Sequence, residues 1–458
     1  MVDAGAREPV MEEQEKSDQL PQVQPDNRSV GNRPYAAPGV AAEHETGVLY
    51  QGEFETPSDG TAQAVRLHAR ALARTGVPVL LRSFSGTVVN PQGVVESVHV
   101  AGLPKEVETE VGDLTKTSIG RLQASVKHLV VRNAEHLRQA IVPRGAVVSD
   151  PDDLDGQIRM RDALYAKTIV YSVWERDSID EAVARQLARA GQCWVPSEHN
   201  AKLLVARGVP GEKVHVVPHP FTDDDLIHQC TQRPAKAHGG QKRFYSIGRW
   251  EPRKGFALLI AAFLKAFAPG DNATLTIKWS GSGMWPQYLT PDDALHVART
   301  SFGATNGWDE ESAKRAVKLI PGRLPRSQIV GLHLQNNIYV SSSHGEAFNL
   351  SAFDAKLAGN RLVHVPWGGT ADFAGADDVA VPYEMYPVHP SYRWESDAQW
   401  ASFEVEHMAR ALRSAAELER FRENFHRDPK LDVFSMAAVG QKMRSLVQKL
   451  VPEKKLAL

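Results

Sequence analysis

Short apolar runs alternate with amphipathic helical segments along most of this chain, and the alternation limits the possible folds more than any other feature. Residues 48–50 are expected to form a buried strand, 61–75 a helix, and 77–81 the next strand. The same order recurs at 169–217 and at 243–279. Because strand–helix–strand units build parallel sheets covered by helices, the sequence predicts an α/β fold made of two doubly wound domains.

Changes in composition divide the chain into five parts. Residues 1–40 are polar and rich in Pro, and they are expected to be a disordered tail. A first Rossmann-like domain is expected at 41–230, and a polar linker at 231–242. A second α/β domain is expected at 243–430, and a terminal amphipathic helix within 431–458.

Overall composition excludes several classes of protein. With 42% hydrophobic and 24% charged residues, the chain is typical of a globular protein. A formal net charge of -2 gives no global field for nucleic acid, and two cysteines do not make a disulfide framework. The acidic N-terminus is unlike a signal peptide, and no apolar run is long enough to span a membrane. We therefore expect a cytoplasmic protein without nucleic-acid partners.

No metal or cofactor is expected. The acidic clusters at 150–155, 223–225 and 292–293 superficially resemble metal-binding motifs. They lie in polar or Pro-containing loops without the spacing of ligands, so we interpret them as solvated turns. Residues 281–320 look irregular and are interpreted as an insertion.

The most informative segment is 341–359, SSSHGEAFNLSAFDAKLAG. It follows an expected strand at 338–340 and continues into a helix near Leu350, so its turn places backbone amides at the carboxyl edge of a parallel sheet. Amides in that position favour a phosphate group. Glu346 lies in the turn, and Asp354 lies one turn into the helix beside an apolar stripe, where a carboxylate needs partners.

A second turn, SIGRWEPRKG at 246–255, also joins a strand to a helix. Arg249 and Lys254 flank this turn. Their positive charges are suited to neutralising a diphosphate leaving group. The alternative is an ordinary solvated pair of cations, although cations near a helix N-terminus are mildly unfavourable.

Together, GRWEPRKG and HGEAFNLSAFDAKLAG resemble the large retaining glycosyltransferase family with the GT-B fold, which includes sucrose-, trehalose- and mannosyl-type enzymes. Its hallmarks are a G-R-x4-K-G turn and a Glu-x7-Glu pattern. Both are in register here, except that Asp354 replaces the second Glu. The stretch from Trp194 to Pro220 and the opening strand with its Gly60 loop are also similar, so the resemblance covers roughly 45–450. It implies two Rossmann-like domains that face a central cleft, with 41–230 on the acceptor side and 243–430 binding the nucleotide sugar. It also implies that the helix at 431–458 crosses back to the first domain.

The resemblance also implies roles for individual residues. Arg249 and Lys254, in the turn that begins at Gly248, would bind the donor diphosphate, and Glu346 would contact the donor sugar at the reaction centre. Asp354 would hold the ribose hydroxyls. Backbone amides would support the diphosphate around three residues, Asn349, Leu350 and Ser351, which stand where the family usually has Gly-Leu-Pro.

Other residues have two interpretations. His128 and His136 are candidates for contact with the acceptor or the donor sugar, but a lone histidine is more often structural. Glu346 is alternatively a turn residue that satisfies local amides. Asp354 is alternatively part of a structural ion pair, for example with Lys356.

The function expected from the residues and the resemblance is transfer of a sugar, with retention of configuration, from a nucleotide-diphosphate sugar to an acceptor hydroxyl. The acceptor is a saccharide, a lipid or a small molecule that the sequence does not identify, and the nucleotide sugar is a substrate rather than a cofactor. One alternative is a nucleotide-sugar epimerase or phosphorylase-like enzyme. The other is a degenerate, non-catalytic nucleotide-sugar-binding protein, which the altered 349–351 turn and Asp354 keep open.

Overall fold

The structure is a computed structural model that describes residues 46–56, 59–84, 87–89, 95–97, 103–117, 119, 121–142, 154–221, 241–281, 289–389, 398–420 and 429–450. The expected tail at 1–40 and most of the expected linker at 231–242 lie outside these residues.

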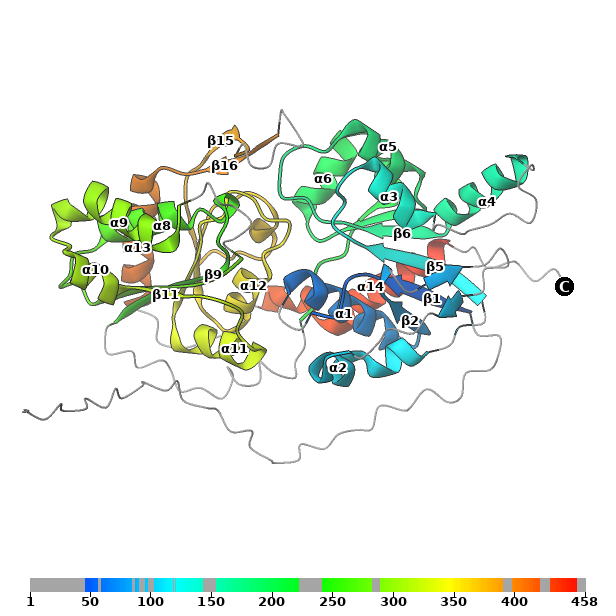
Figure 1. Cartoon of the computed structure of the whole chain (residues 1–458), viewed down its shortest axis with the longest axis horizontal. Helices are drawn as coiled ribbons and strands as arrows, with labels where there is room; N and C mark the ends of the chain where they lie inside the picture. The colour runs from blue at the N-terminus through cyan, green and yellow to red at the C-terminus, as the bar shows by residue number, and fades with distance from the viewer. Residues whose placement is uncertain are drawn as a thin grey trace, which may run out of the picture. The chain divides into compact units, whose positions relative to one another are not determined.

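Two six-stranded sheets organise the chain, and every neighbouring pair of strands in them is parallel (Figure 1). The first sheet has the order β2-β1-β5-β6-β7-β8 and the second β11-β10-β9-β12-β13-β14. Two antiparallel pairs, β3 with β4 and β15 with β16, complete the described strands. The predicted pair of doubly wound sheets is confirmed.

The strands are β1 (Thr46–Gln51), β2 (Val79–Arg82), β3 (Thr87–Val89), β4 (Val95–Ser97), β5 (Arg121–His128), β6 (Thr168–Tyr171), β7 (Gln192–Val195), β8 (Val214–Val216), β9 (Lys242–Arg249), β10 (Ala273–Ser280), β11 (Val317–Ile320), β12 (Ile338–Ser341), β13 (Arg361–His364), β14 (Val379–Ala380), β15 (Glu384–Pro387) and β16 (Gln399–Ser402). The helices are α1 (Gly60–Ala73), α2 (Lys105–Lys116), α3 (Ala134–Ile141), α4 (Leu154–Ala166), α5 (Glu181–Arg189), α6 (Glu198–Ala206), α8 (Phe256–Ala266), α9 (Pro291–Ala298), α10 (Glu310–Ala316), α11 (Arg326–Gln335), α12 (Leu350–Leu357), α13 (Val405–Arg420) and α14 (Met436–Leu450).

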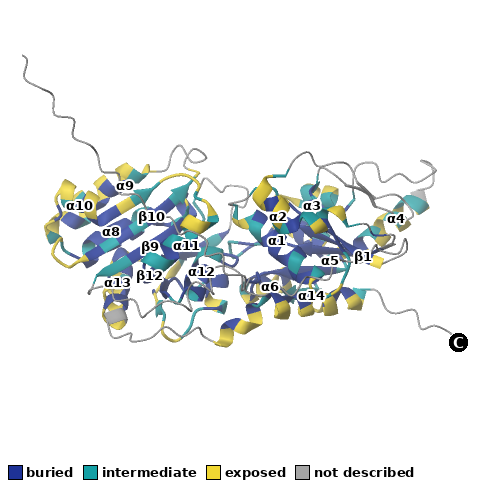
Figure 2. Ribbon diagram, turned by 90° about the horizontal axis from the view of Figure 1, so that it is seen from below, coloured by how far each residue is buried: buried dark blue, intermediate teal, exposed yellow. Residues whose placement is uncertain are grey.

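Helices cover both faces of each sheet, and this explains why β6, β7, β12 and β13 are buried along their whole length (Figure 2). One face of the first sheet shares a core with α1, α2 and α14, and the other packs on α3, α5 and α6. In the second sheet, α8, α9 and α13 cover one face, while α11 and α12 cover the other.

Strand order places the two sequence motifs side by side. From β9 the second sheet first extends through β10 to β11, and then in the opposite direction through β12, β13 and β14. β9 pairs directly with β12, through Phe244 opposite Ile338 and Tyr245 opposite Tyr339. The carboxyl ends of β9 and β12 therefore meet where the strand order reverses, which is where open α/β sheets bind ligands.

The expectation that 281–320 is irregular is wrong for its described part, whereas its interpretation as an insertion stays a prediction. α9, α10 and β11 lie within it, and β11 forms the edge of the second sheet by pairing with β10. Trp308 is buried, and its indole N–H donates to the backbone oxygens of Leu264 and Phe267 at 3.0 and 2.8 Å. The segment escapes recognition in the sequence because its helices and its strand are short.

α14, the last helix, packs against α1 at a glycine. A Cβ atom on Gly440 would lie 2.3 Å from the carbonyl oxygen of Ala71, so the two helices approach at a distance that only glycine permits. The buried residues Met436, Val439 and Met443 of α14 join the core of the first sheet beside this contact.

We predict that Gly440→Ala lowers the free energy of unfolding by about 1–3 kcal/mol, because the methyl group forces α14 away from α1. Gly331→Ala in α11 is the matched control, since its Cβ would meet no atom nearer than 4.0 Å. Alanine favours helices, so the control should be neutral or up to about 1 kcal/mol more stable. Urea unfolding of both variants measures the difference, and equal stabilities would contradict the close contact.

Candidate active site

The turn after β9 and the loop after β12 are locked together. The turn is a 3-10 segment, Pro252–Lys254, and it ends at Gly255, whose φ of 61° is left-handed. A Cβ atom on Gly255 would lie 2.4 Å from the carbonyl oxygen of Ser342. The Ser342 hydroxyl donates to the backbone oxygen of Lys254 at 2.7 Å. The backbone amide of His344 donates to the backbone oxygen of Arg253, also at 2.7 Å. The two motif segments therefore form one structure.

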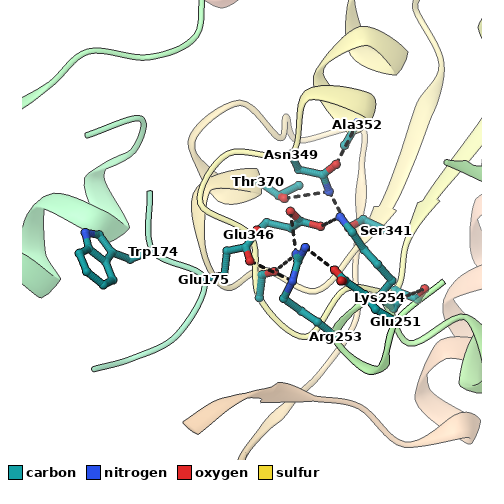
Figure 3. Close-up of polar contacts among 12 residues, drawn as sticks. Trp174, Glu175, Glu251, Arg253, Lys254, Ser341, Glu346, Asn349, Ala352 and Thr370 are labelled. Carbon is teal, nitrogen blue, oxygen red and sulfur yellow. Dashed lines mark hydrogen bonds and ion pairs between the residues drawn. The ribbon is translucent and has the colours of Figure 1, made fainter. Parts of the chain in front are cut away.

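Lys254 and Glu346 face each other across this junction (Figure 3). The Lys254 ammonium lies 2.5 Å from Glu346 Oε1, and the two side chains are 14% and 8% exposed. Gly248 leaves room for the lysine, because a Cβ atom there would lie 3.3 Å from Lys254 Cδ and Cε. The structure thus brings together three of the residues that the sequence motifs singled out.

A further turn, after β13, fixes the backbone of Glu346. The amide of Gly369 donates to the Glu346 carbonyl oxygen at 2.7 Å. Gly368 has a φ of 83°, and a Cβ atom on it would lie 2.5 Å from the same oxygen. This Gly-Gly pair was missed in the sequence, although two adjacent glycines after an apolar strand are a signal of close backbone approach.

Glu346 is held in its ionised form. Burial by itself would raise the pKa of its carboxyl group, but the positive charges of Lys254 and Arg253 outweigh burial and lower the pKa to about 2. The group is therefore a carboxylate at any physiological pH and acts only as a hydrogen-bond acceptor or a negative charge.

Arg253, which sequence reasoning missed, is the centre of this cluster. Its guanidinium contacts three carboxylates: Glu251 at 2.6 Å, Glu175 at 3.0 Å and Glu346 at 3.2 Å. It also donates to the backbone oxygen of Gly345 at 2.8 Å. Arg253 precedes Lys254 in the same motif. The sequence signal that could have identified it is a second cation in a turn that also contains a glutamate, Glu251.

The N-terminus of α12 offers unused donors. Asn349 is the N-cap, with a left-handed φ of 78°, and its side chain accepts from the Ala352 amide at 3.2 Å and donates to the Ser341 hydroxyl at 2.9 Å. The amides of Leu350 and Ser351 have no hydrogen-bond partner among the described residues. Two free amides beside Lys254 make an anion-binding position.

Asp354 makes an ion pair, but not with Lys356. Its Oδ2 lies 2.5 Å from the Arg326 guanidinium of α11 and 4.0 Å from His333 Nε2. Lys356 instead pairs with Asp378 at 2.8 Å, so the suggested Lys356 partner is wrong. A residue distant in sequence supplies the counter-charge, which helical spacing alone could not indicate.

Arg249 lies at the end of β9 and is more exposed than the other cations. Its side chain is 54% exposed, and it pairs with Asp59 Oδ2 at 3.1 Å. Asp59 also caps α1, where its Oδ1 accepts from the amides of Thr61 and Ala62. Gly60, the next residue, lies near α12, with Leu350 Cδ1 3.6 Å from where its Cβ would be. Arg249 and Gly60 therefore belong to the surroundings of the α12 N-terminus.

His128 is packed among aromatic residues. It is 2% exposed, its Nδ1 lies 2.9 Å from the Tyr50 hydroxyl, and its ring stands 5.4 Å from that of His68 and 6.4 Å from that of His219. The His219 ring in turn meets Phe348 edge-on at 4.9 Å, two residues from Glu346 in the chain. We call His68, His128 and His219 the histidine cluster. Contact of His128 with a sugar stays a prediction.

His136 lies elsewhere, in the first turn of α3. The side chain of Asn133 accepts from its amide at 2.8 Å, and its Nδ1 accepts from the Arg132 amide at 3.3 Å. No contact joins it to Lys254 or Glu346 within the described residues, so its expected sugar contact also stays a prediction.

Among the described residues, no group of three or more His, Cys, Asp or Glu side chains is placed to hold a metal ion. No described helix is long and apolar enough to cross a membrane.

Comparison with known proteins identifies the fold. No family model and no curated protein sequence matches the chain. Among solved structures, the chain is similar to HepE of Anabaena in complex with UDP and glucose, with a TM-score of 0.54 and 12% identity over 89% of this chain and 100% of that one. It is also similar to the trehalose 6-phosphate synthase of Burkholderia multivorans, with a TM-score of 0.51 and 12% identity over 89% and 98%. The chain has the GT-B fold of these structures, as the resemblance implied.

The histidine cluster generates a prediction about pH. Burial lowers the pKa of His68 to about 4, and it lowers those of His128 and His219 well below 6.5, with repulsion between the rings adding to the effect in the latter two. As pH falls below 6.5, these histidines become protonated in the unfolded chain but stay neutral in the folded protein. The free energy of unfolding is therefore highest above pH 6.5, and each histidine removes about 1.4 kcal/mol per pH unit below it.

Between pH 7 and pH 5 the free energy of unfolding should fall in both proteins, and we expect the fall to be about 2 kcal/mol smaller in His68→Gln than in the wild type. Glutamine keeps a donor for the Pro218 oxygen, which lies 3.0 Å from His68 Nε2, and has no titrating group. His296→Gln, at an exposed position of α9, is the control and should behave like the wild type. Urea unfolding at both pH values measures the loss. The same loss in wild type and His68→Gln would rule out the proposed role of this histidine.

Proposed function

We propose that this protein is a glycosyltransferase that moves a sugar from a nucleotide-diphosphate sugar to an acceptor hydroxyl, with retention of configuration. The observation that carries the proposal is the Lys254–Glu346 pair beside the free amides of Leu350 and Ser351, at the point where the strand order of the second sheet reverses. This site offers a cation and amides for a diphosphate, and an ionised carboxylate for sugar hydroxyls.

Charge neutralisation explains the role that we assign to Lys254 and Arg249. Negative charge develops on the diphosphate when the bond to the sugar breaks, and fixed cations and amides stabilise this charge without reorganisation. The Lys254 ammonium would donate hydrogen bonds to both Glu346 and the diphosphate. Arg249 would leave its ion pair with Asp59 and contact a phosphate oxygen instead. We assign this function to protein cations and not to a divalent metal ion.

Glu346 would act on the sugar. Its carboxylate is buried, ionised and held by Arg253 even when Lys254 turns towards a phosphate. A fixed negative charge beside the reacting carbon stabilises the positive charge that a sugar ring develops as its leaving group departs. With retention, the acceptor enters on the face that the diphosphate leaves, so a donor phosphate oxygen can receive the acceptor proton.

Asp354 would bind the ribose of the donor. The carboxylate has a second oxygen besides the one that pairs with Arg326, and the helix places it one turn beyond the free amides. Aspartate is shorter than the glutamate of the resembled family, and Arg326 compensates part of its buried charge. Structural neighbours give the base to be tried first, because HepE was solved with UDP and with UDP-glucose.

Two rival functions follow from the same fold. A nucleotide-sugar epimerase or phosphorylase-like enzyme would use the donor site without transfer to an acceptor hydroxyl. A non-catalytic binding protein would bind the donor and release no sugar. Conversion of the nucleotide sugar in the absence of an acceptor would favour the epimerase or phosphorylase-like enzyme. Any release of sugar by the pure protein would exclude the non-catalytic binding protein.

We predict that Lys254→Ala and Arg249→Ala each weaken binding of UDP roughly 10- to 100-fold, because each removes one charge-assisted contact. Lys318→Ala, an exposed lysine of β11, is the control and should bind like the wild type. Isothermal titration calorimetry with EDTA present measures binding without a contribution from divalent metal. Unchanged affinity in both variants would remove the diphosphate role of this turn.

The two carboxylates are expected to differ in kinetics. Glu346→Gln should lower kcat roughly 100-fold with little change in KM, because the lost charge acts mainly in the transition state. Asp354→Asn should raise KM for the nucleotide sugar, since ribose contacts are equal before and during reaction, whereas Asp354→Glu should be tolerated. Steady-state kinetics and circular dichroism of the three variants test this. A fully active Glu346→Gln enzyme would exclude the retaining mechanism.

A further inference from the structure

The cluster around Arg253 holds more negative than positive charge. Glu175, Glu251 and Glu346 contribute three carboxylates, and Arg253 and Lys254 contribute two cations, so the formal charge is one negative when all five groups are ionised. Glu251 and Glu346 are 7% and 8% exposed, so solvent screens their charges weakly. An anionic ligand that binds beside Lys254 is therefore repelled by the excess negative charge of the cluster.

Glu175 differs from the other two carboxylates in origin. It lies in the loop that follows β6 of the first sheet, whereas Glu251 and Glu346 follow strands of the second sheet (Figure 3). The loop is held firmly. A Cβ atom on Gly345 would lie 2.0 Å from the Glu175 carbonyl oxygen, and Asp177 in the same loop accepts from the Gln399 amide at 2.6 Å. The backbone of Glu175 is therefore held in place beside the site.

Glu175 is also the carboxylate that solvent reaches. Its side chain is 38% exposed. One oxygen lies 3.0 Å from Arg253 Nε, and the other has no partner among the described residues. A proton can thus join the second oxygen without breaking the ion pair geometry. Desolvation by the surrounding chain, together with the charges of Glu346 and Glu251, raises the pKa of Glu175, although Arg253 and Lys254 oppose the rise.

Charges from two segments of the second sheet act on Glu175. Arg253, Lys254 and Glu251 approach from the turn after β9, and Glu346 approaches from the loop after β12. Other ionisable residues lie in these segments or next to them: Arg176 and Asp177 in the loop after β6, His199 in α6, and His344 in the loop after β12. His344 is buried with a pKa of about 4, so it is neutral near pH 7.

We propose that Glu175 takes up one proton from solvent when the diphosphate of a nucleotide sugar binds beside Lys254, so that the donor complex contains Glu175 as a neutral carboxylic acid. The inference rests on the proposed function, because that function places the anion there. The step is an ordinary protonation: a carboxylate and a solvent proton form a carboxyl group, and one unit of negative charge leaves the cluster as the diphosphate enters. Glu175 is then a residue of the donor site that the first sheet contributes.

Glu175→Gln separates this role from a structural one. Glutamine has the shape of the protonated acid and carries no charge, so the variant should bind the donor more tightly at pH 8, by roughly 3- to 10-fold for one charge a few ångströms away. A residue that only held Arg253, or that accepted a hydrogen bond from a sugar hydroxyl as a carboxylate, would give weaker binding when replaced.

The experiment is isothermal titration calorimetry between pH 6 and pH 8, in pairs of buffers with different ionisation enthalpies. The probe is UDP-glucose, followed by GDP-mannose and ADP-glucose if UDP-glucose does not bind; the diphosphates of all three are diesters that do not titrate in this range. We expect the wild type to take up as much as one proton per donor and to bind more tightly as pH falls. Glu175→Gln should take up none and show no pH dependence. Glu212→Gln, at an exposed position, is the control and should match the wild type.

Binding by the wild type without proton uptake, or weaker binding by Glu175→Gln, would overturn this inference and leave the proposed function standing. Failure of all three nucleotide sugars to bind the wild type would overturn the proposed function and this inference together.

Discussion

The contact between the turn after β9 and the loop after β12 is the constraint on which the rest of the site depends. Gly255 adopts a left-handed conformation against the Ser342 carbonyl. The Ser342 hydroxyl and the His344 amide donate to backbone oxygens of the turn after β9, and the Arg253 guanidinium donates back to the Gly345 oxygen. Any side chain at Gly255 would collide with this carbonyl. Because the segments cannot separate locally, Lys254 and Glu346 are held at ion-pair distance before any ligand arrives.

Electrostatics then follow from this packing. Two adjacent cations, Arg253 and Lys254, face a buried carboxylate and keep Glu346 ionised despite its burial. Arg253 is also shared with Glu251 and Glu175, so the cluster has one more carboxylate than it has cations. Under our proposal, protonation of Glu175 offsets part of the negative charge that a diphosphate brings to this cluster.

The first sheet contributes to this arrangement as well. Its loop after β6 supplies Glu175, and the histidine cluster reaches Phe348, near Glu346, through the ring of His219. These contacts connect the cores beneath the two sheets to the same short loop. Stability at low pH and the geometry of the candidate site therefore depend on neighbouring groups.

The sequence by itself determined the parallel α/β architecture, because the period of the apolar residues distinguishes buried strands from amphipathic helices. It also determined that Lys254 and Glu346 lie in strand-to-helix turns, since such turns have a local glycine signature. Only the tertiary structure decided which charges meet. Arg326 rather than Lys356 neutralises Asp354, Arg253 gathers three carboxylates, and Glu175 comes from the other sheet. Strand order sets these pairings, and it depends on long-range packing that local periodicity does not encode.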